Sequence, residues 1–178
     1  MTIVIDTETT GFSPSADELL QVAIIDGEGN TLFNSYLHPE KTNSWPEAQR
    51  VNGITPEMVK DAPTIRDVLP EIQRIVNGAN AIVGYNVGFD YSFLLCAGCE
   101  FPGVGTEPPA CELVDVMEMF APIYGEWNEY YGGFKWQKLT TAAAHFGYDW
   151  GEDNAHDALA DCRATLFVWK KLHDKREV

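Results

Sequence analysis

Residues 6–11 read Asp-Thr-Glu-Thr-Thr-Gly and directly follow the apolar run Thr2-Ile3-Val4-Ile5. The run has no glycine or proline and predicts a buried strand, which a turn near Gly11 ends. Alternate residues of a strand share a face, so Asp6 and Glu8 place two carboxylates on one side, about 7 Å apart along the chain. Two carboxylates this close repel each other and favour a cation between them. An isolated Asp-x-Glu is nonetheless more often an acidic loop, so the interpretation depends on the rest of the chain.

Composition places the chain among ordinary globular proteins. It has 178 residues, 45% hydrophobic and 22% charged, and we expect a single domain over residues 1–178. No apolar run approaches the roughly 20 residues that a membrane span needs, and Met1 leads into a strand without a basic signal region. The sequence therefore predicts a cytoplasmic protein with no membrane partner.

Four cysteines, the last of them Cys162, are expected to be reduced thiols, because nothing marks the chain for secretion. Cys96 and Cys99 have zinc-like spacing, but a structural zinc site needs four ligands. Cys111 is the only other thiol at all near in the sequence. Ordinary helix-end and loop cysteines are therefore favoured over a zinc site.

The formal net charge of −15 limits the kinds of partner that the chain can bind. Tight binding of nucleic acid over a long footprint rests on phosphate neutralisation by Lys and Arg, and this balance argues against it. An enzyme that grips only a few nucleotides stays compatible with the charge, since bound divalent cations would reverse its sign locally.

The order of predicted elements is typical of an α/β protein. Strands over 18–26 and 31–37, joined by a turn at 27–30, form an antiparallel meander with the first strand. A helix that ends at residue 76 is expected to start near Asp67 or to kink at Pro70, since proline disrupts a helix interior. Short helical pieces are expected at 45–59, and strands at 79–85 and 111–115. Four further helices are expected: one that starts at 86, one that ends at 120, one at 139–146 and one that starts at 154.

The segment 125–134 is aromatic, acidic and flexible. Its rings could stack on bases, as in proteins that bind single strands. The first basic residue that follows is Lys135, so a surface loop or a contact with a protein partner is favoured over base stacking.

Two further acids occupy positions where core residues are expected. Asp90 shares a helical stripe with Leu94 and Ala97, and a buried carboxylate needs a partner. A functional role and a structural one, as a salt bridge or at an exposed edge, both stay open. Asp161 shares its stripe with apolar and small residues at 158, 165, 168 and 172. Asp157 has a sufficient structural explanation, because Asn154 can cap the last helix and the third position favours a carboxylate.

Acids of this kind thus occur in three separate parts of the chain. The first part has Asp6 and Glu8, the second has Asp90, and the third has Asp161 with His156 close by. Four oxygen ligands suit Mg²⁺ or Mn²⁺ rather than a thiol-and-imidazole zinc cage. Two such ions, roughly 4 Å apart, could hold the attacking and leaving oxygens of a phosphodiester displacement.

Three motifs resemble those of the DEDDh, or DnaQ-like, 3′-5′ exonucleases of the RNase H-like superfamily. They are Asp-x-Glu-Thr-Thr-Gly at 6–11, Asn86-x-x-Phe89-Asp90, and His156-x-x-x-x-Asp161. Residues 51–55 match the family's connecting segment, and Lys138-Leu139 match the helix before the third motif, so the resemblance covers nearly the whole chain. It implies an RNase H-like fold, with a mixed central sheet of three antiparallel strands then parallel strands, flanked by helices, and with the acids clustered at the sheet.

The resemblance also implies roles for the site residues. Asp6, Glu8, Asp90 and Asp161 would bind two divalent ions, Mg²⁺ or Mn²⁺, with Asp6 as the bridge. His156 would take the proton from the attacking water, and a place in the first turn of the last helix would favour its neutral form. The substrate-binding residues it implies are Thr9 and Thr10 beside the terminal sugar, Asn52, Ile54 and Phe89 around the terminal base, and Asn86.

Two residues depart from the family pattern. Many relatives have His where this chain has Asn52, and Arg where it has Asp157. Both changes remove positive charge near the phosphate, which affects affinity and substrate length rather than the chemistry.

The leading hypothesis is an exonuclease that trims single-stranded 3′ ends of DNA or RNA and releases nucleoside 5′-monophosphates. The alternative is a proofreading subunit that acts as the partner of a DNA polymerase. The chain ends soon after the last helix, at 175–178, without a tail for tethering, which favours the first hypothesis. A nucleic-acid binder without catalysis is disfavoured, because all five catalytic-type residues are present.

Overall fold

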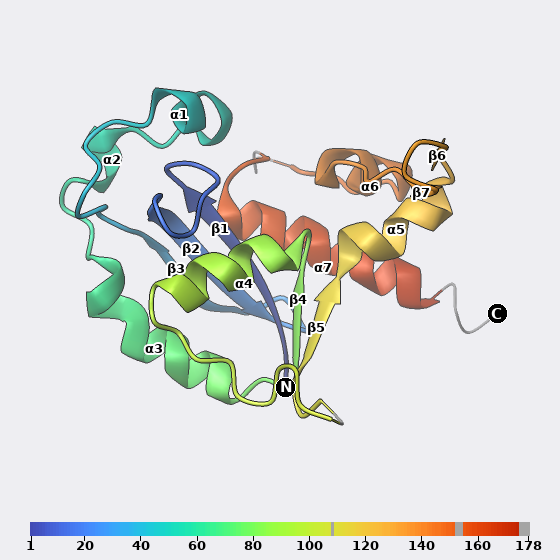
Figure 1. The fold of residues 1–178 in the computed structure, drawn as a ribbon, viewed down its shortest axis with the longest axis horizontal. Helices are drawn as coiled ribbons and strands as arrows, with labels where there is room; N and C mark the ends of the chain where they lie inside the picture. Colours follow the sequence, from blue (N-terminus) through green and yellow to red (C-terminus); the bar gives the residue numbers. More distant parts are fainter. Residues whose placement is uncertain (108, 152–154, 175–178) are drawn as a thin grey trace.

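A five-stranded mixed sheet forms the centre of the fold in the computed structural model, which describes residues 1–107, 109–151 and 155–174 (Figure 1). Its order is β3-β2-β1-β4-β5. The pairs β1–β2 and β2–β3 are antiparallel, whereas β1–β4 and β4–β5 are parallel, so the predicted meander followed by parallel strands is confirmed. The strands are β1 (Thr2–Thr9), β2 (Leu19–Asp26), β3 (Thr31–Tyr36), β4 (Ala81–Gly84) and β5 (Glu112–Asp115).

Helices cover both faces of this sheet (Figure 1). One face packs against α3 (Ile65–Asn77) and α4 (Val87–Cys96), and the other against α5 (Val116–Tyr124), α6 (Leu139–His145) and α7 (Ala158–Asp174). Two short helices, α1 (Pro46–Asn52) and α2 (Pro56–Val59), lie beyond the ends of the strands. Among the described residues, no helix is long and apolar enough to span a membrane.

The central strand β1 divides its side chains between the two layers. Ile3 and Ile5 belong to the core beneath α3 and α4, whereas Val4 belongs to the core beneath α7. Since strand residues alternate, Asp6 and Glu8 follow Val4 toward α7. The pairing of β1 with β4 stops at Val4, so both carboxylates lie past the carboxyl end of β4. That edge is where side chains of open α/β sheets gather to form sites.

Two helix boundaries differ from their predictions. α3 begins at Ile65 and passes through Pro70. The Asp67 carboxylate accepts hydrogen bonds from the Thr64 main-chain N–H (2.8 Å) and hydroxyl (2.7 Å), which fixes the helix start two residues earlier than expected. Pro70 is exposed, so water can bond the carbonyl that its ring leaves unpaired. α5 extends to Tyr124 rather than ending at Phe120.

The aromatic segment contains a small hairpin, β6 (Trp127–Asn128) with β7 (Gly133–Phe134), where a flexible loop was expected. The Asn128 side chain accepts the main-chain N–H groups of Tyr130 (3.0 Å) and Tyr131 (3.3 Å), which forms the turn. The Trp127 and Phe134 rings meet edge to face at 5.2 Å. Local hydrogen bonds and one ring pair thus order the segment.

A buried tryptophan anchors the connection that carries α1. Trp45 is 4% exposed and packs with Leu20, Ile54 and Val59. Its indole N–H donates to the Ile54 carbonyl at 2.7 Å, across the base of the loop that α1 occupies. The position of α1 relative to β1 therefore depends on this contact.

Replacing Trp45 by Phe should lower the free energy of unfolding by about 1–3 kcal/mol, since the Ile54 carbonyl loses its donor and the cluster loses volume. Urea unfolding followed by circular dichroism measures the change. Trp136→Phe is the matched control, because the side chain of Trp136 is exposed and its loss should change stability by no more than about 0.5 kcal/mol. Equal changes in the two variants would contradict the anchoring role.

Candidate functional site

Side chains from three elements meet past the carboxyl end of β4. Glu8 on β1, Asp161 on α7 and His156 before α7 offer ligand atoms that all lie within 4.8 Å of one another. Among the described residues, this is the group of His, Cys, Asp and Glu side chains close enough to hold a metal ion. The four cysteines are free thiols and lie outside it.

Asp6 and Asp90 lie outside this group of ligand atoms. Asp90, in the first turn of α4, is 3% exposed, and its charge contributes to the raised pKa of Asp6 and of Glu8. The partner that a buried carboxylate requires is Thr7, whose hydroxyl donates to Asp90 Oδ1 at 2.7 Å. Thr7 alternates with Asp6 and Glu8 along β1 and so faces the α4 layer. β1 therefore supplies two carboxylates and also fixes a third from the opposite layer.

His156 differs from its prediction in backbone position. α7 begins at Ala158, so His156 precedes the first turn, and the expected effect of the helix dipole on its charge has no basis here. Its φ of 71° is left-handed, which non-glycine residues seldom adopt. The His156 main-chain N–H points to the Asp161 carboxylate, 3.3 and 3.4 Å from its two oxygens. Asp161 thereby holds the loop that carries the exposed imidazole.

The predicted cap at residue 154 lies outside the described residues. Asp157 immediately precedes α7 and bonds its first turn. Asp157 Oδ1 accepts the N–H groups of Leu159 and Ala160, both at 3.1 Å. Its other oxygen accepts the Gln21 side-chain amide at 3.1 Å, and Gln21 in turn accepts the Ala158 N–H at 3.3 Å. The predicted role of Asp157 in the helix start is thus confirmed, at the cap position.

Burial and mutual repulsion hold protons on the clustered acids. The pKa of Asp6 lies well above its usual range, first because it is desolvated and then because of the charges of Asp90 and Asp161. Burial followed by the Asp161 charge raises the pKa of Glu8 to about 8. The pKa of Asp90 and that of Asp161 rise to about 7, in both cases mainly through burial.

These shifts test whether the cluster fits divalent cations. The charges that raise the pKa of Asp6 and Glu8 most are all other carboxylates. Buried acids that face one another without a compensating cation are costly, and hard divalent ions prefer such oxygen ligands. Asp6, Glu8, Asp90 and Asp161 therefore fit Mg²⁺ or Mn²⁺ on the chemistry of the donor set.

A cleft opens on the α1 side of the acids. It has a volume of about 380 Å³ and is bordered by Glu8, by α1 and by α4. Four of the predicted substrate-binding residues line it: Thr9 and Thr10 after the carboxylates, Phe89 on α4 and Asn52 on α1. Asn52 and Val51 of α1 close its other side.

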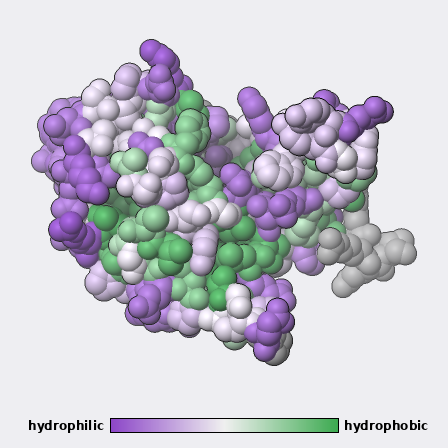
Figure 2. Space-filling view, in the orientation of Figure 1, coloured by the Kyte–Doolittle hydropathy of each residue, from purple (hydrophilic) through white to green (hydrophobic). Residues whose placement is uncertain are grey.

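A second hollow continues on the far side of the acids. It has a volume of about 750 Å³ and is lined by His156 and Asp161 together with Arg50, Tyr85, Trp136 and Lys138. Val51 borders both hollows, with Glu8 lining the first and Asp161 the second. Figure 2 shows the surface depressed between the lobe that carries α1 and the lobe that carries α6.

Three of the predicted substrate-binding residues stabilise the fold through hydrogen bonds or core packing. Asn52 donates to the Thr9 carbonyl (3.3 Å) and accepts the Ile54 N–H (3.0 Å), which ties α1 to β1. Ile54 is 2% exposed and packs beneath α1 instead of lining the described hollow. Asn86 adopts a left-handed conformation at the start of α4, and its N–H donates to Asp115 at 3.0 Å.

The hydroxyls of Thr9 and Thr10 also bond within the chain. Thr9 donates to the Gly11 carbonyl at 2.6 Å, and the Thr10 oxygen accepts the Glu18 N–H at 2.9 Å. These bonds shape the turn that follows β1 and hold both threonines at the edge of the hollow.

Sequence reasoning missed several residues that position the site. Gln21 carried a readable signal, since it is a polar residue inside the apolar run of β2. Thr7 could have been found from strand alternation. Trp136 and Tyr85 enter the second hollow only through the tertiary fold, and no local pattern marks them.

A family model described as an exonuclease matches residues 3–168. An uncharacterized exonuclease of Escherichia phage 186 is 37% identical over 173 residues, which cover 93% of this chain and 84% of the phage protein. A PolC-type DNA polymerase III of Clostridium perfringens is 28% identical over 99% of this chain, but this chain spans only 12% of that protein's length.

Two solved structures share the fold. Exonuclease X in complex with 5′ overhanging duplex DNA matches with a TM-score of 0.72 and 23% identity, over 100% of this chain and 94% of that one. The zinc-bound form of the E. coli exonuclease I complex with single-stranded DNA matches with a TM-score of 0.76 and 25% identity, over 98% of this chain and 40% of that one.

Removing one of the repelling charges should stabilise the metal-free protein. In EDTA near about pH 8, Asp161→Asn should raise the free energy of unfolding by about 1–3 kcal/mol. A carboxyl group whose pKa is raised on folding keeps its proton to a higher pH in the native state than in the unfolded state. The free energy of unfolding therefore falls as pH rises from about 4 through the native-state pKa. The stability advantage of the variant should accordingly shrink below about pH 5.

Urea unfolding of both proteins across that pH range measures this difference. Asp61→Asn removes one negative charge from an exposed position and controls for net charge. A loss of stability in Asp161→Asn at high pH would show that the acids do not destabilise one another.

Proposed function

Because this chain belongs to the DnaQ-like exonuclease family, we propose that it removes nucleotides from single-stranded 3′ ends with the aid of two divalent ions. Family membership makes it a nuclease that hydrolyses phosphodiester bonds. The observation that carries the proposal is the cluster of Glu8, Asp161 and His156, with ligand atoms within 4.8 Å, between two open hollows.

The proposed ion ligands are Asp6, Glu8, Asp90 and Asp161. When bound, divalent ions activate water and stabilise the charge that develops on the departing oxygen. The chain's own contribution is to hold four carboxylates in a partly dry setting, with the Asp90 carboxylate oriented by Thr7. The zinc ion named for the exonuclease I complex supports the binding of a divalent ion by a protein of this fold.

His156 is the proposed general base. Its imidazole is exposed beside Glu8 and Asp161, where it can accept the proton of the attacking water. The Asp161 carboxylate positions the His156 main chain, so one carboxyl group serves both an ion and the base. Cleavage at the bond next to the 3′ end then releases a nucleoside 5′-monophosphate.

The terminal nucleoside is proposed to occupy the hollow beside α1. Phe89 offers a ring face there, and Asn52, Thr9 and Thr10 offer polar atoms. Ile54 supports α1 from beneath. Single-stranded DNA is the proposed substrate, since the structures of exonuclease X and exonuclease I contain DNA, and RNA is the alternative outcome of the assay. We further propose that residues 1–178 form one exonuclease domain.

A second candidate function is proofreading beside a DNA polymerase. It is favoured by the match to PolC-type polymerases, in which the similar region is a small part of the protein. Titration with a replicative polymerase tests it: binding, or stimulation of exonuclease activity, would support a subunit role, and neither would exclude it for that polymerase.

Two neighbouring acids should differ sharply in their effect on turnover. Asp161→Asn should lower kcat by about 1,000-fold, because it removes a proposed ion ligand. Asp157→Asn should stay within about tenfold of the parent, since an amide oxygen can still cap α7. Initial rates in Mg²⁺, with folding checked by circular dichroism, measure both effects. Comparable losses would mean that the ligand is wrongly assigned.

A time course on 5′-labelled single-stranded DNA and RNA of equal sequence tests the reaction itself. In Mg²⁺ or Mn²⁺ the 5′-labelled strand should give a ladder of products that shorten from the 3′ end, and EDTA should stop the cleavage. His156→Ala should slow the rate by about 100-fold or more. His173→Ala, at the far end of α7, is the control and should keep the parent rate. Cleavage in EDTA, or full activity of His156→Ala, would overturn the mechanism.

A further inference from the structure

Large aromatic side chains gather in the open on one part of the molecule. The exposed fractions of Tyr130 (88%), Tyr131 (80%) and Trp136 (65%) exceed those of the other exposed aromatics except Phe12, and Trp127 and Phe134 are also exposed. All of them belong to the β6–β7 hairpin or to the segment just after it. Solvent-exposed rings concentrated in one place mark a binding surface more often than chance exposure.

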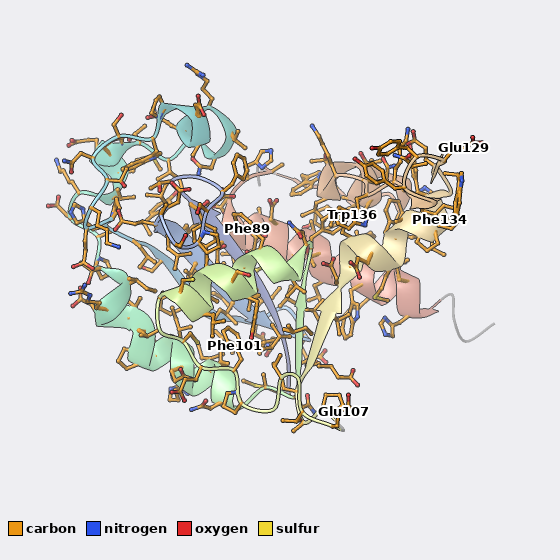
Figure 3. The ribbon with its side chains drawn as sticks, in the orientation of Figure 1. Phe89, Phe101, Glu107, Glu129, Phe134 and Trp136 are labelled. Atoms are coloured by element: carbon orange, nitrogen blue, oxygen red, sulfur yellow. The ribbon has the colours of Figure 1, made fainter. Side chains whose placement is uncertain are left out.

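This aromatic surface continues directly into the catalytic cleft. A hollow of about 600 Å³ is lined by Asn128, Tyr131, Phe134, Lys135 and Trp136. Trp136 also lines the hollow that contains His156 and Asp161. Figure 3 shows Trp136 between Phe134 of the hairpin and Phe89 of α4. A chain leaving the catalytic acids on this side therefore meets Trp136 first and the hairpin next.

Hydrogen bonds within the chain fix the conformation of the hairpin. The Glu126 carboxylate accepts the Lys135 ammonium at 2.6 Å and the Gln137 amide at 3.1 Å, which closes the two ends of the hairpin on each other. Tyr85 donates its hydroxyl to the Gln137 carbonyl at 2.9 Å and ties the segment to the end of β4. Rings held in this way lose little conformational entropy when they bind.

Positive charge is placed along the same path. The chain has only 12 basic residues against 27 acidic ones. Three of those 12 line the two joined hollows, with Arg50 and Lys138 beside the acids and Lys135 beside the hairpin rings. Cations for the backbone and flat rings for the bases are the two features that sequence-independent binding of single strands requires.

We propose that Trp136 and the β6–β7 hairpin, with Tyr131 and Phe134, form a stacking platform for the bases of a single-stranded substrate upstream of the cleaved bond. This inference rests on the proposed function, since it extends the substrate path from the same site. The platform supplies affinity by stacking, which compensates for the scarcity of cations elsewhere on an acidic protein. It also makes binding depend on the length of the strand.

Binding without cleavage tests the platform. Anisotropy of 5′-fluorescein oligothymidylates in EDTA gives Kd for lengths of about 12 and about 3 nucleotides. Trp136→Ala should raise Kd for the longer strand by about 5- to 100-fold, and Tyr131→Ala should weaken it in the same direction. Tyr124→Ala is the control, because Tyr124 is also an exposed tyrosine but lies on α5 and lines neither hollow. Its Kd should stay within about twofold of the parent value.

Steady-state kinetics in Mg²⁺ separates the platform from the catalytic centre. Trp136→Ala should raise KM more than it lowers kcat, and the loss in kcat/KM should be greater for the long strand than for the short one. Equal losses at both lengths, or a loss confined to kcat, would place Trp136 in the chemistry and overturn the proposal.

The two proposals fail in different ways. If the parent protein degrades the strand and Trp136→Ala binds it as tightly as the parent does, the platform is wrong while the exonuclease function stands. The exposed rings would then be a surface for a protein partner. If the parent protein neither binds nor shortens any strand, the proposed function fails, and the platform fails with it.

Discussion

The crowding of Asp6, Glu8, Asp90 and Asp161 at one end of the sheet is the constraint on which the rest of the structure depends. Burial and like charge together raise the pKa of Glu8 to about 8 and that of Asp161 to about 7, so the ionised cluster opposes the fold that assembles it. The rest of the chain must supply stability that outweighs this repulsion. It does so with two apolar layers, one on each face of β1, which hold the acids from both sides.

Each layer delivers one acid to the cluster. α4 brings Asp90 from one face, where the Thr7 hydroxyl meets it, and α7 brings Asp161 from the other, with Cys162 and Val168 fully buried behind it. β1 runs past the end of its partner β4, which leaves Asp6 and Glu8 free of further strand pairing on that side. The position of Asp6 and Glu8 therefore follows from the extension of β1 beyond the end of β4.

Sequence alone predicted the sheet and its mixed pairing, and it singled out Glu8, His156 and Asp161, whose ligand atoms the fold brings within 4.8 Å of one another. The alternation of β1, together with the acids on the apolar faces of α4 and α7, indicated a cluster of oxygen ligands. The three motifs indicated the family. What the sequence could not give depends on contacts distant along the chain. The start of α7 rests on the bond between Gln21 and Asp157, which are far apart in sequence. The burial of Ile54 depends on Trp45, and the reach of Trp136 into the cleft depends on Tyr85 and Gln137.

The raised pKa values also set the charge of the site. Near neutral pH the acids still hold protons, because the pKa of Asp90 and that of Asp161 are about 7 and that of Glu8 is about 8. The cluster therefore carries less negative charge than its carboxyl groups would carry in water, and that charge changes across the neutral range. The burial that keeps these groups from water thus makes the electrostatic potential of the cleft depend on the pH around it.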